Sequence, residues 1–357
     1  MRETARRAFL ATVVVLGVIV FVLALWKMRL LLALLFLAFT IAAAMRPGVD
    51  AMRRYGIPRG VGILLHYAAL TGLVGVLLYS VVPRAINQVH EAVGNVPTSR
   101  AELRQQTQES TGLKREILER IERNLEDLPS GSDVVDPALE FTTIAFEVAV
   151  GIFFVLACAA YWIFERDRAV DLVSSFVPES RAKIVRDTWR LIDLKLGAYV
   201  RGQFLLVLLV GTVLSFIFWT IGLPFWLLLG IFAGLVEIVP VLGPLAAGAL
   251  AVGVGLTESW GVALAAGIAV LVVRLLEDYL VIPRVLGDAV GLSPLVVLVA
   301  VAATAILFGG FAVLLAIPAA AVLATLVDVI VHKVDPSREQ VPTVLFPAKD
   351  AETTSGR

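Results

Sequence analysis

The chain has 357 residues, of which 59% are hydrophobic and only 17% are charged. A composition this apolar, with several runs of about twenty hydrophobic residues, excludes an ordinary soluble domain and predicts an all-α polytopic membrane protein. Thirty basic and thirty acidic residues cancel, so no overall charge favours nucleic acid as a partner. The single cysteine, Cys158, excludes an internal disulfide and a thiolate metal cluster.

Nine apolar stretches follow one another in the order 9–26, 30–45, 60–82, 141–164, 203–222, 225–256, 259–282, 292–308 and 310–331. The second stretch is followed by a basic loop, which the positive-inside rule assigns to the cytoplasm and whose arginines are Arg46, Arg53, Arg54 and Arg59. Basic residues also precede the first stretch, and no small-residue cleavage site follows it. This pattern predicts a retained first span with the N-terminus in the cytoplasm.

The C-terminal tail carries Lys333 and Arg338, which favours a cytoplasmic position as well. With both termini in the cytoplasm the number of full crossings is even, so one of the nine stretches does not cross. The stretch 225–256 is the natural candidate, because its prolines and glycine break the helix and predict a re-entrant hairpin or a pair of half-helices. About eight transmembrane helices plus this broken segment follow. In an alternative, 292–331 bends at Gly309-Gly310 and forms the hairpin, while 225–256 crosses.

Two polar regions interrupt the spans. The first, 84–140, has a capping box at Ser99 and Glu102 and apolar residues at helical intervals, which predict an extracytoplasmic amphipathic helical region. The second, 165–201, has an apolar stripe beside basic side chains and predicts a helix in the cytoplasmic interface, against either anionic lipid or its own bundle. The expected organisation is therefore N-terminal spans (1–83), the extracytoplasmic helical region (84–140), a span (141–164), the interfacial region (165–201), a C-terminal membrane core with the broken helix (202–332) and a polar tail (333–357).

The broken stretch contains a carboxylate, Glu237, where hydrocarbon should surround the chain. A charged side chain at the bilayer centre costs about 2.5 to 3.5 kcal/mol on insertion scales, so Glu237 must be paired, be protonated or face water. Its neighbours Ile238 and Val239 offer no partner. The nearest candidate is Arg274, which shares a helix face with Glu277, and Asp278 follows directly. We expect Arg274 and Glu277 to pair with each other at the membrane edge.

Two interpretations of these residues remain open. In the functional one, Glu237 is an alternately exposed proton or cation site, and carbonyl groups freed around Pro240, Gly243 and Pro244 supply oxygen ligands. In the structural one, Glu237 and Arg274 form a bridge that only locks two helices together. No catalytic constellation, metal-ligand motif or nucleotide-binding motif accompanies them, so the sequence predicts neither an enzyme nor a cofactor.

Three motifs resemble the autoinducer-2 exporter family of bacterial permeases, namely Gly197–Gln203, Glu237–Pro244 and Leu276–Gly287. The likeness extends from about Leu30 to about Val331. It implies a permease of the bacterial cytoplasmic (inner) membrane and a homo-oligomer, such as a pentamer. It further implies export of a signalling furanone, or exchange of sodium or lithium for protons. The family often has histidine in the segment where this chain has Ser293.

We therefore expect a secondary transporter whose partners are membrane lipids and a small polar solute or a cation, with its pathway at the broken segment. One alternative is an oligomeric channel in which Glu237 sets the cation preference. Another is a membrane scaffold that presents the region 84–140 to an external partner. An ion gradient or simple downhill export is the expected driving force, since the chain has no nucleotide-binding motif.

Overall fold

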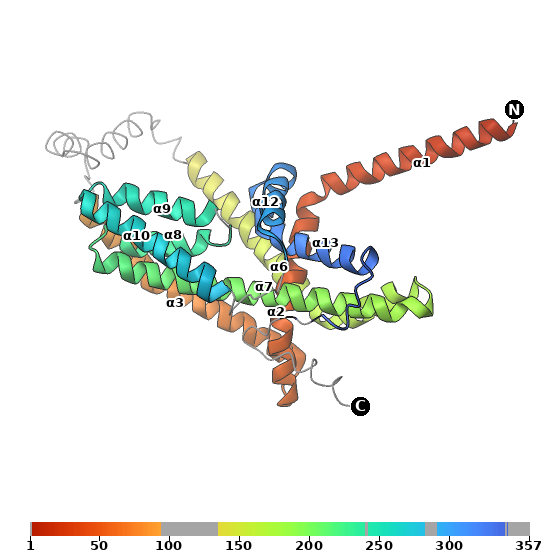
Figure 1. Cartoon of the computed structure of the whole chain (residues 1–357), viewed down its shortest axis with the longest axis horizontal. Coiled ribbons are helices and arrows are strands. Elements are labelled where there is room, and N and C mark those ends of the chain that lie inside the picture. The colour runs from red at the N-terminus through yellow and green to blue at the C-terminus, as the bar shows by residue number, and fades with distance from the viewer. Residues whose placement is uncertain (1, 94–134, 240–241, 283–290, 340, 342–357) are drawn as a thin grey trace.

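The computed structural model describes residues 2–93, 135–239, 242–282, 291–339 and 341 of the chain. Within these residues every regular element is a helix, which confirms the all-α prediction (Figure 1). Most of the predicted extracytoplasmic region 84–140, including Ser99 and Glu102, lies outside the described residues.

The N-terminal half of the fold consists of four helices: α1 (Arg2–Lys27), α2 (Arg29–Arg54), α3 (Arg59–Val93) and α6 (Val135–Ser175). Helix α1 projects away from the rest of the molecule in Figure 1, and its apolar window is 0% buried. Helix α2 lies at the centre of this half. Its residues Ala38 and Val49 pack with Ile63 of α3 and Ala159 of α6 in one buried apolar cluster.

Helix α7 (Glu179–Thr220) is one continuous helix where the sequence predicts an interfacial region up to residue 201 and a separate span from residue 203. The boundaries expected at 164/165 and 201/202 are not helix ends, because α6 continues to Ser175 and α7 runs through the expected interfacial region into the following span. No proline interrupts its backbone hydrogen bonds between its first and last residues. Part of its apolar stripe contacts neighbouring helices: the rings of Trp189 and of Trp162 on α6 have centroids 5.9 Å apart, and Leu196 is buried.

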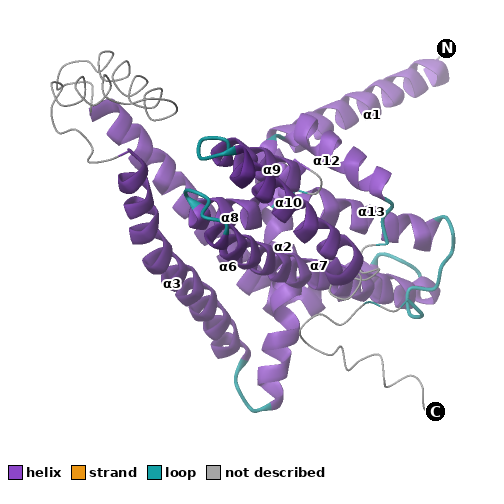
Figure 2. Ribbon diagram, turned by 60° about the vertical axis from the view of Figure 1, so that its left-hand side comes forward, coloured by secondary structure: helices purple, strands orange, loops and turns teal. Residues whose placement is uncertain are grey.

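Two further helices pack on the C-terminal half of α7, namely α8 (Trp226–Val236) and α10 (Trp260–Leu276), which continues into a π-helical turn, η1 (Glu277–Val281). Helix α9 (Leu242–Gly255) packs on α8 and α10. They lie side by side in Figure 1 and Figure 2. Phe218, Ala233, Ala251 and Ala266, one from each helix of the group, are at most 1% exposed and form the centre of its core. These small side chains let the helix backbones approach closely.

The last part of the fold consists of α12 (Pro294–Phe308), the 3-10 turn η2 (Gly310–Leu315) and α13 (Ala316–Ile330). Ser293 caps α12 by accepting a hydrogen bond from the backbone N–H of Val296 at 3.4 Å, so this residue has a local structural role. The chain bends at Gly309, whose φ of 89° lies in the region that favours glycine. The helix is therefore interrupted in both of the segments that the sequence proposes as broken, 225–256 and 292–331.

Seven helical stretches within the described residues are long and apolar enough to cross a membrane: 9–27, 29–54, 59–81, 146–175, 179–220, 260–281 and 310–330. Helices α8, α9 and α12 are shorter, with 11, 14 and 15 residues. At 1.5 Å per residue α12 extends about 22 Å, which is less than the hydrocarbon thickness of about 30 Å. The stretch 292–308, expected as a full span, is thus too short to cross as a single helix.

Candidate functional site

The break between α8 and α9 is built around Gly243. Helix α8 ends at Val236, and α9 begins at Leu242 with Gly243 donating its N–H to the carbonyl of Val239 at 2.8 Å. A Cβ atom at Gly243 would overlap the carbonyl oxygen of Val236, so only glycine fits where the two helix ends meet. Pro244 follows in the first turn of α9, where a missing N–H leaves no helical hydrogen bond unmade.

The carboxylate of Glu237 lies at this break and is buried. Its residue is 6% exposed, and its Oε1 accepts a hydrogen bond from Nη1 of Arg274 on α10 at 2.8 Å. The backbone carbonyl of the same residue accepts a hydrogen bond from Nε2 of Gln203 on α7 at 3.1 Å. Side chains from α7 and α10 therefore hold the break from two sides.

Arg274 contacts two more carboxylates. Its Nη1 lies 3.3 Å from Oε2 of Glu277, and its Nη2 lies 2.8 Å from Oδ1 of Asp278. Glu277 pairs with Arg274, as their spacing predicts, and its residue is only 1% exposed.

The four charged residues carry excess negative charge when all of them are ionised, since one guanidinium faces three carboxylates. The Oε1 atom of Glu277 is buried and has no hydrogen-bond partner among the described residues. A cavity of about 10 Å³ lies between Glu237, Arg274, Glu277 and Pro244. A water needs roughly 10–15 Å³ of such space, so the cavity is at the scale of one water or one small ion. Three carboxylates around one guanidinium repel one another, and this repulsion favours uptake of a proton or a cation.

The structure brings most of the predicted site residues together. Glu237, Arg274, Glu277 and Asp278 form one ion-paired group, and Gly243 and Pro244 border it, whereas Pro240 lies outside the described residues. Within the described residues no three histidine, cysteine or acidic side chains are grouped so as to hold a metal ion. Sequence reasoning did not select Gln203 as a site residue, although it ends the motif Gly197–Gln203.

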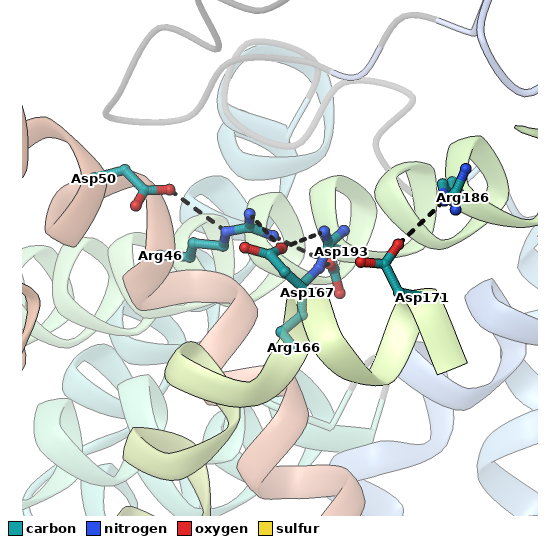
Figure 3. Close-up of polar contacts among 7 residues, drawn as sticks. All are labelled: Arg46, Asp50, Arg166, Asp167, Asp171, Arg186 and Asp193. Carbon is teal, nitrogen blue, oxygen red and sulfur yellow. Dashed lines mark hydrogen bonds and ion pairs between the residues drawn. The ribbon is translucent and has the colours of Figure 1, made fainter. Parts of the chain in front are cut away.

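A second ion-paired group joins α2, α6 and α7 (Figure 3). Nε of Arg166 donates to Oδ2 of Asp193 at 2.7 Å, and Arg46 lies 3.5 Å from Asp167 and 3.6 Å from Asp193. Asp50 also pairs with Arg46, at 3.4 Å. Apolar periodicity gave no signal for this group, which ties α2 and α6 to the N-terminal half of α7.

Comparison with known proteins gives a consistent result. The model of the AI-2E family transporter matches residues 13–332, nearly the whole chain. The chain is 27% identical over 305 residues to YrrI of Bacillus subtilis, which is named as a candidate transport protein, with 81% of this chain and 83% of that protein covered. It is also 27% identical over 346 residues to MT0215 of Mycobacterium tuberculosis, likewise named as a candidate transport protein, with coverage of 92% and 91%. The match to PerM of Escherichia coli, named as a candidate permease, is 25% identical over 57% of each chain. The chain therefore belongs to the AI-2E transporter family and is a multi-pass membrane protein of that family.

Proposed function

We propose that this protein is a secondary transporter that exports a small polar solute, or exchanges sodium or lithium for protons, across the bacterial inner membrane. The group Glu237–Arg274–Glu277–Asp278 is the site at which the proton or cation binds. Membership of a transporter family supports transport in general. The observation that carries the site is the buried carboxylate of Glu237 at a helix break, where one guanidinium serves three carboxylates.

The excess of carboxylates gives the site a way to change its charge. If Glu237 binds a proton or a cation and leaves Arg274, the guanidinium retains Glu277 and Asp278 as partners. Arg274 is then not left as an uncompensated buried charge, which would cost about 3 to 5 kcal/mol. A simple locking bridge between two residues has no such reserve, so the arrangement favours the functional interpretation over the structural one.

The helix break supplies the second requirement of a transport site. The last carbonyl groups of α8 have no partner within that helix; those of Leu235 and Val236 accept hydrogen bonds from the N–H groups of Ile238 and Val239, and each carbonyl keeps a second lone pair. These carbonyl oxygens and the carboxylates are hard oxygen ligands, which suit protons, sodium or the polar groups of a small solute. Movement of α8 and α9 relative to α7 and α10 would expose the site to one side of the membrane and then to the other.

The direct test is a flux assay in proteoliposomes that contain a pH-sensitive dye. Sodium, lithium, potassium and the signalling furanone are added in turn to wild type, to Glu237→Gln and to the control Glu258→Gln, an exposed carboxylate in the loop before α10. We expect Glu237→Gln to abolish pH-dependent flux while its melting temperature stays close to that of wild type. Flux that persists unchanged in this variant would falsify the site assignment. Unitary currents in a planar bilayer would instead identify a channel, because a carrier turns over too slowly to produce them.

A further inference from the structure

A large amphipathic cavity lies far along α7 from the helix break. It has a volume of about 1030 Å³ and is enclosed by α2, α6, the N-terminal half of α7, α13 and the tail that follows α13. This volume is at the upper end of the range of roughly 300–1,000 Å³ found for ligand sites. Most of the lining is apolar, and it includes Phe39, Trp162, Trp189 and Leu326.

The charged part of the lining contains three basic and three acidic side chains. Arg181, Lys183 and Lys333 are exposed and border the cavity, and neither Arg181 nor Lys333 has an ion-pair partner among the described residues. Three carboxylates also line it, but two of them are compensated by arginines outside the lining. Asp193 pairs with Arg166 at 2.7 Å, and Asp335 pairs with Arg338 at 3.3 Å. Asp187 remains against the three cations, of which Lys183 also interacts electrostatically with Asp335.

The tail forms a wall of this cavity and is held by an ion pair to a buried lysine. Residues Val334–Ser337 line the cavity, and Oε1 of Glu339 lies 2.6 Å from Nζ of Lys195 on α7. The side chain of Lys195 is 6% exposed, and its Nζ also donates to Oγ1 of Thr325 on α13 at 3.3 Å. The cavity is therefore closed on this side by specific contacts between the tail, α7 and α13.

The position of the cations relative to the apolar lining matches an amphiphile from the bilayer. Arg181 and Lys183 lie at the start of α7, and Lys333 lies just after α13, on the ends of the helices that the charge pattern assigns to the cytoplasm. The aromatic lining comes from the apolar parts of α2 and α6 and from Trp189 of α7. We infer that the cavity binds an anionic phospholipid of the cytoplasmic leaflet, with an acyl chain among the aromatic residues and the phosphate against the three cations. This site is independent of the proposed transport site.

Tryptophan fluorescence provides the test, because two of the six tryptophans line the cavity. Replacing the others, at positions 26, 219, 226 and 260, by phenylalanine leaves Trp162 and Trp189 as the emitters. This background is purified in detergent and titrated with phosphatidylglycerol or phosphatidylcholine that carries brominated acyl chains, which quench tryptophan on contact. We expect phosphatidylglycerol to reach half-maximal quenching at a concentration at least fivefold lower than phosphatidylcholine.

Two variants and a competitor complete the test. The triple variant Arg181→Gln/Lys183→Gln/Lys333→Gln is expected to lose the fivefold preference, whereas the control Arg53→Gln/Arg54→Gln, which removes exposed charge outside the cavity, should keep it. Val322→Phe, which fills part of the lining, should lower maximal quenching at an unchanged melting temperature. Equal quenching by the two lipids, an unaltered preference in the triple variant, or full displacement by inorganic phosphate each overturns the proposal.

Discussion

Nη1 of Arg274 lies 2.8 Å from Oε1 of Glu237, and this contact ties the break between α8 and α9 to the end of α10. The same nitrogen lies 3.3 Å from Oε2 of Glu277. One cation thus serves two carboxylates that are almost completely buried. The consequences for stability and transport can be separated by substitution.

Arg274→Gln should destabilise the protein by about 3 kcal/mol, because it leaves the carboxylates of Glu237 and Glu277 buried without a cation. The double variant Arg274→Gln/Glu237→Gln should recover at least half of that loss, since it removes one of the uncompensated charges. The free energy of unfolding in mixed micelles measures both effects. Strict additivity of the two single substitutions would show that the residues do not share an ion pair.

Gly243→Ala should destabilise the helix break by roughly 1 to 3 kcal/mol, because the new Cβ atom would overlap the carbonyl oxygen of Val236. Gly253, on the same helix α9, offers a matched control because a Cβ atom there meets nothing within 4 Å. Gly253→Ala should raise stability by up to about 1 kcal/mol through helix propensity. Melting temperatures of the two variants, compared in one detergent, check the prediction. Equal values for both would mean that the two helix ends do not require their close approach.

Asp193→Asn should weaken the group that joins α2, α6 and α7 far more than Asp171→Asn weakens its neighbouring pair (Figure 3). The side chains of Asp193 and Arg166 are 16% and 13% exposed, whereas those of Asp171 and Arg186 are 69% and 53% exposed. We expect a loss of about 2 to 3 kcal/mol for the first substitution and at most about 1 kcal/mol for the second. Chemical unfolding of both variants decides the matter, and a larger effect at Asp171 would contradict it.

Glu339→Gln should destabilise the tail contact by about 2 to 3 kcal/mol, since the ammonium group of Lys195 then stays buried without its carboxylate. Glu339→Gln/Lys195→Met should restore most of the loss by removing the buried charge. Arg338→Gln, an exposed neighbour, should change stability by no more than about 0.5 kcal/mol. Limited proteolysis checks this: the tail should be cleaved fastest in Glu339→Gln, more slowly in Glu339→Gln/Lys195→Met and slowest in Arg338→Gln. A cleavage rate in Glu339→Gln equal to that of wild type would argue against the contact.

Several features of the fold and site follow from the order of residues alone. Long apolar runs predict helices, because a backbone in hydrocarbon has to satisfy its own hydrogen bonds. Gly243 and the neighbouring prolines predict a broken helix, and a buried acid predicts a cation nearby, which selects Arg274. These are local or charge-balance arguments, and the structure contains a helix break and an ion pair at these residues.

Contacts between helices depend on rotation and register, which hydropathy does not carry. The hydrogen bond from Gln203 to the carbonyl of Glu237, and the pairing of Asp193 with Arg166, arise only when particular helix faces meet. Glu277 shows the limit most clearly, because its spacing from Arg274 predicts their ion pair but does not predict that the residue is only 1% exposed. The sequence by itself determined the helices, the break and the balance of charge. Tertiary packing decided which side chains meet, because a small rotation of a helix selects the face that is buried.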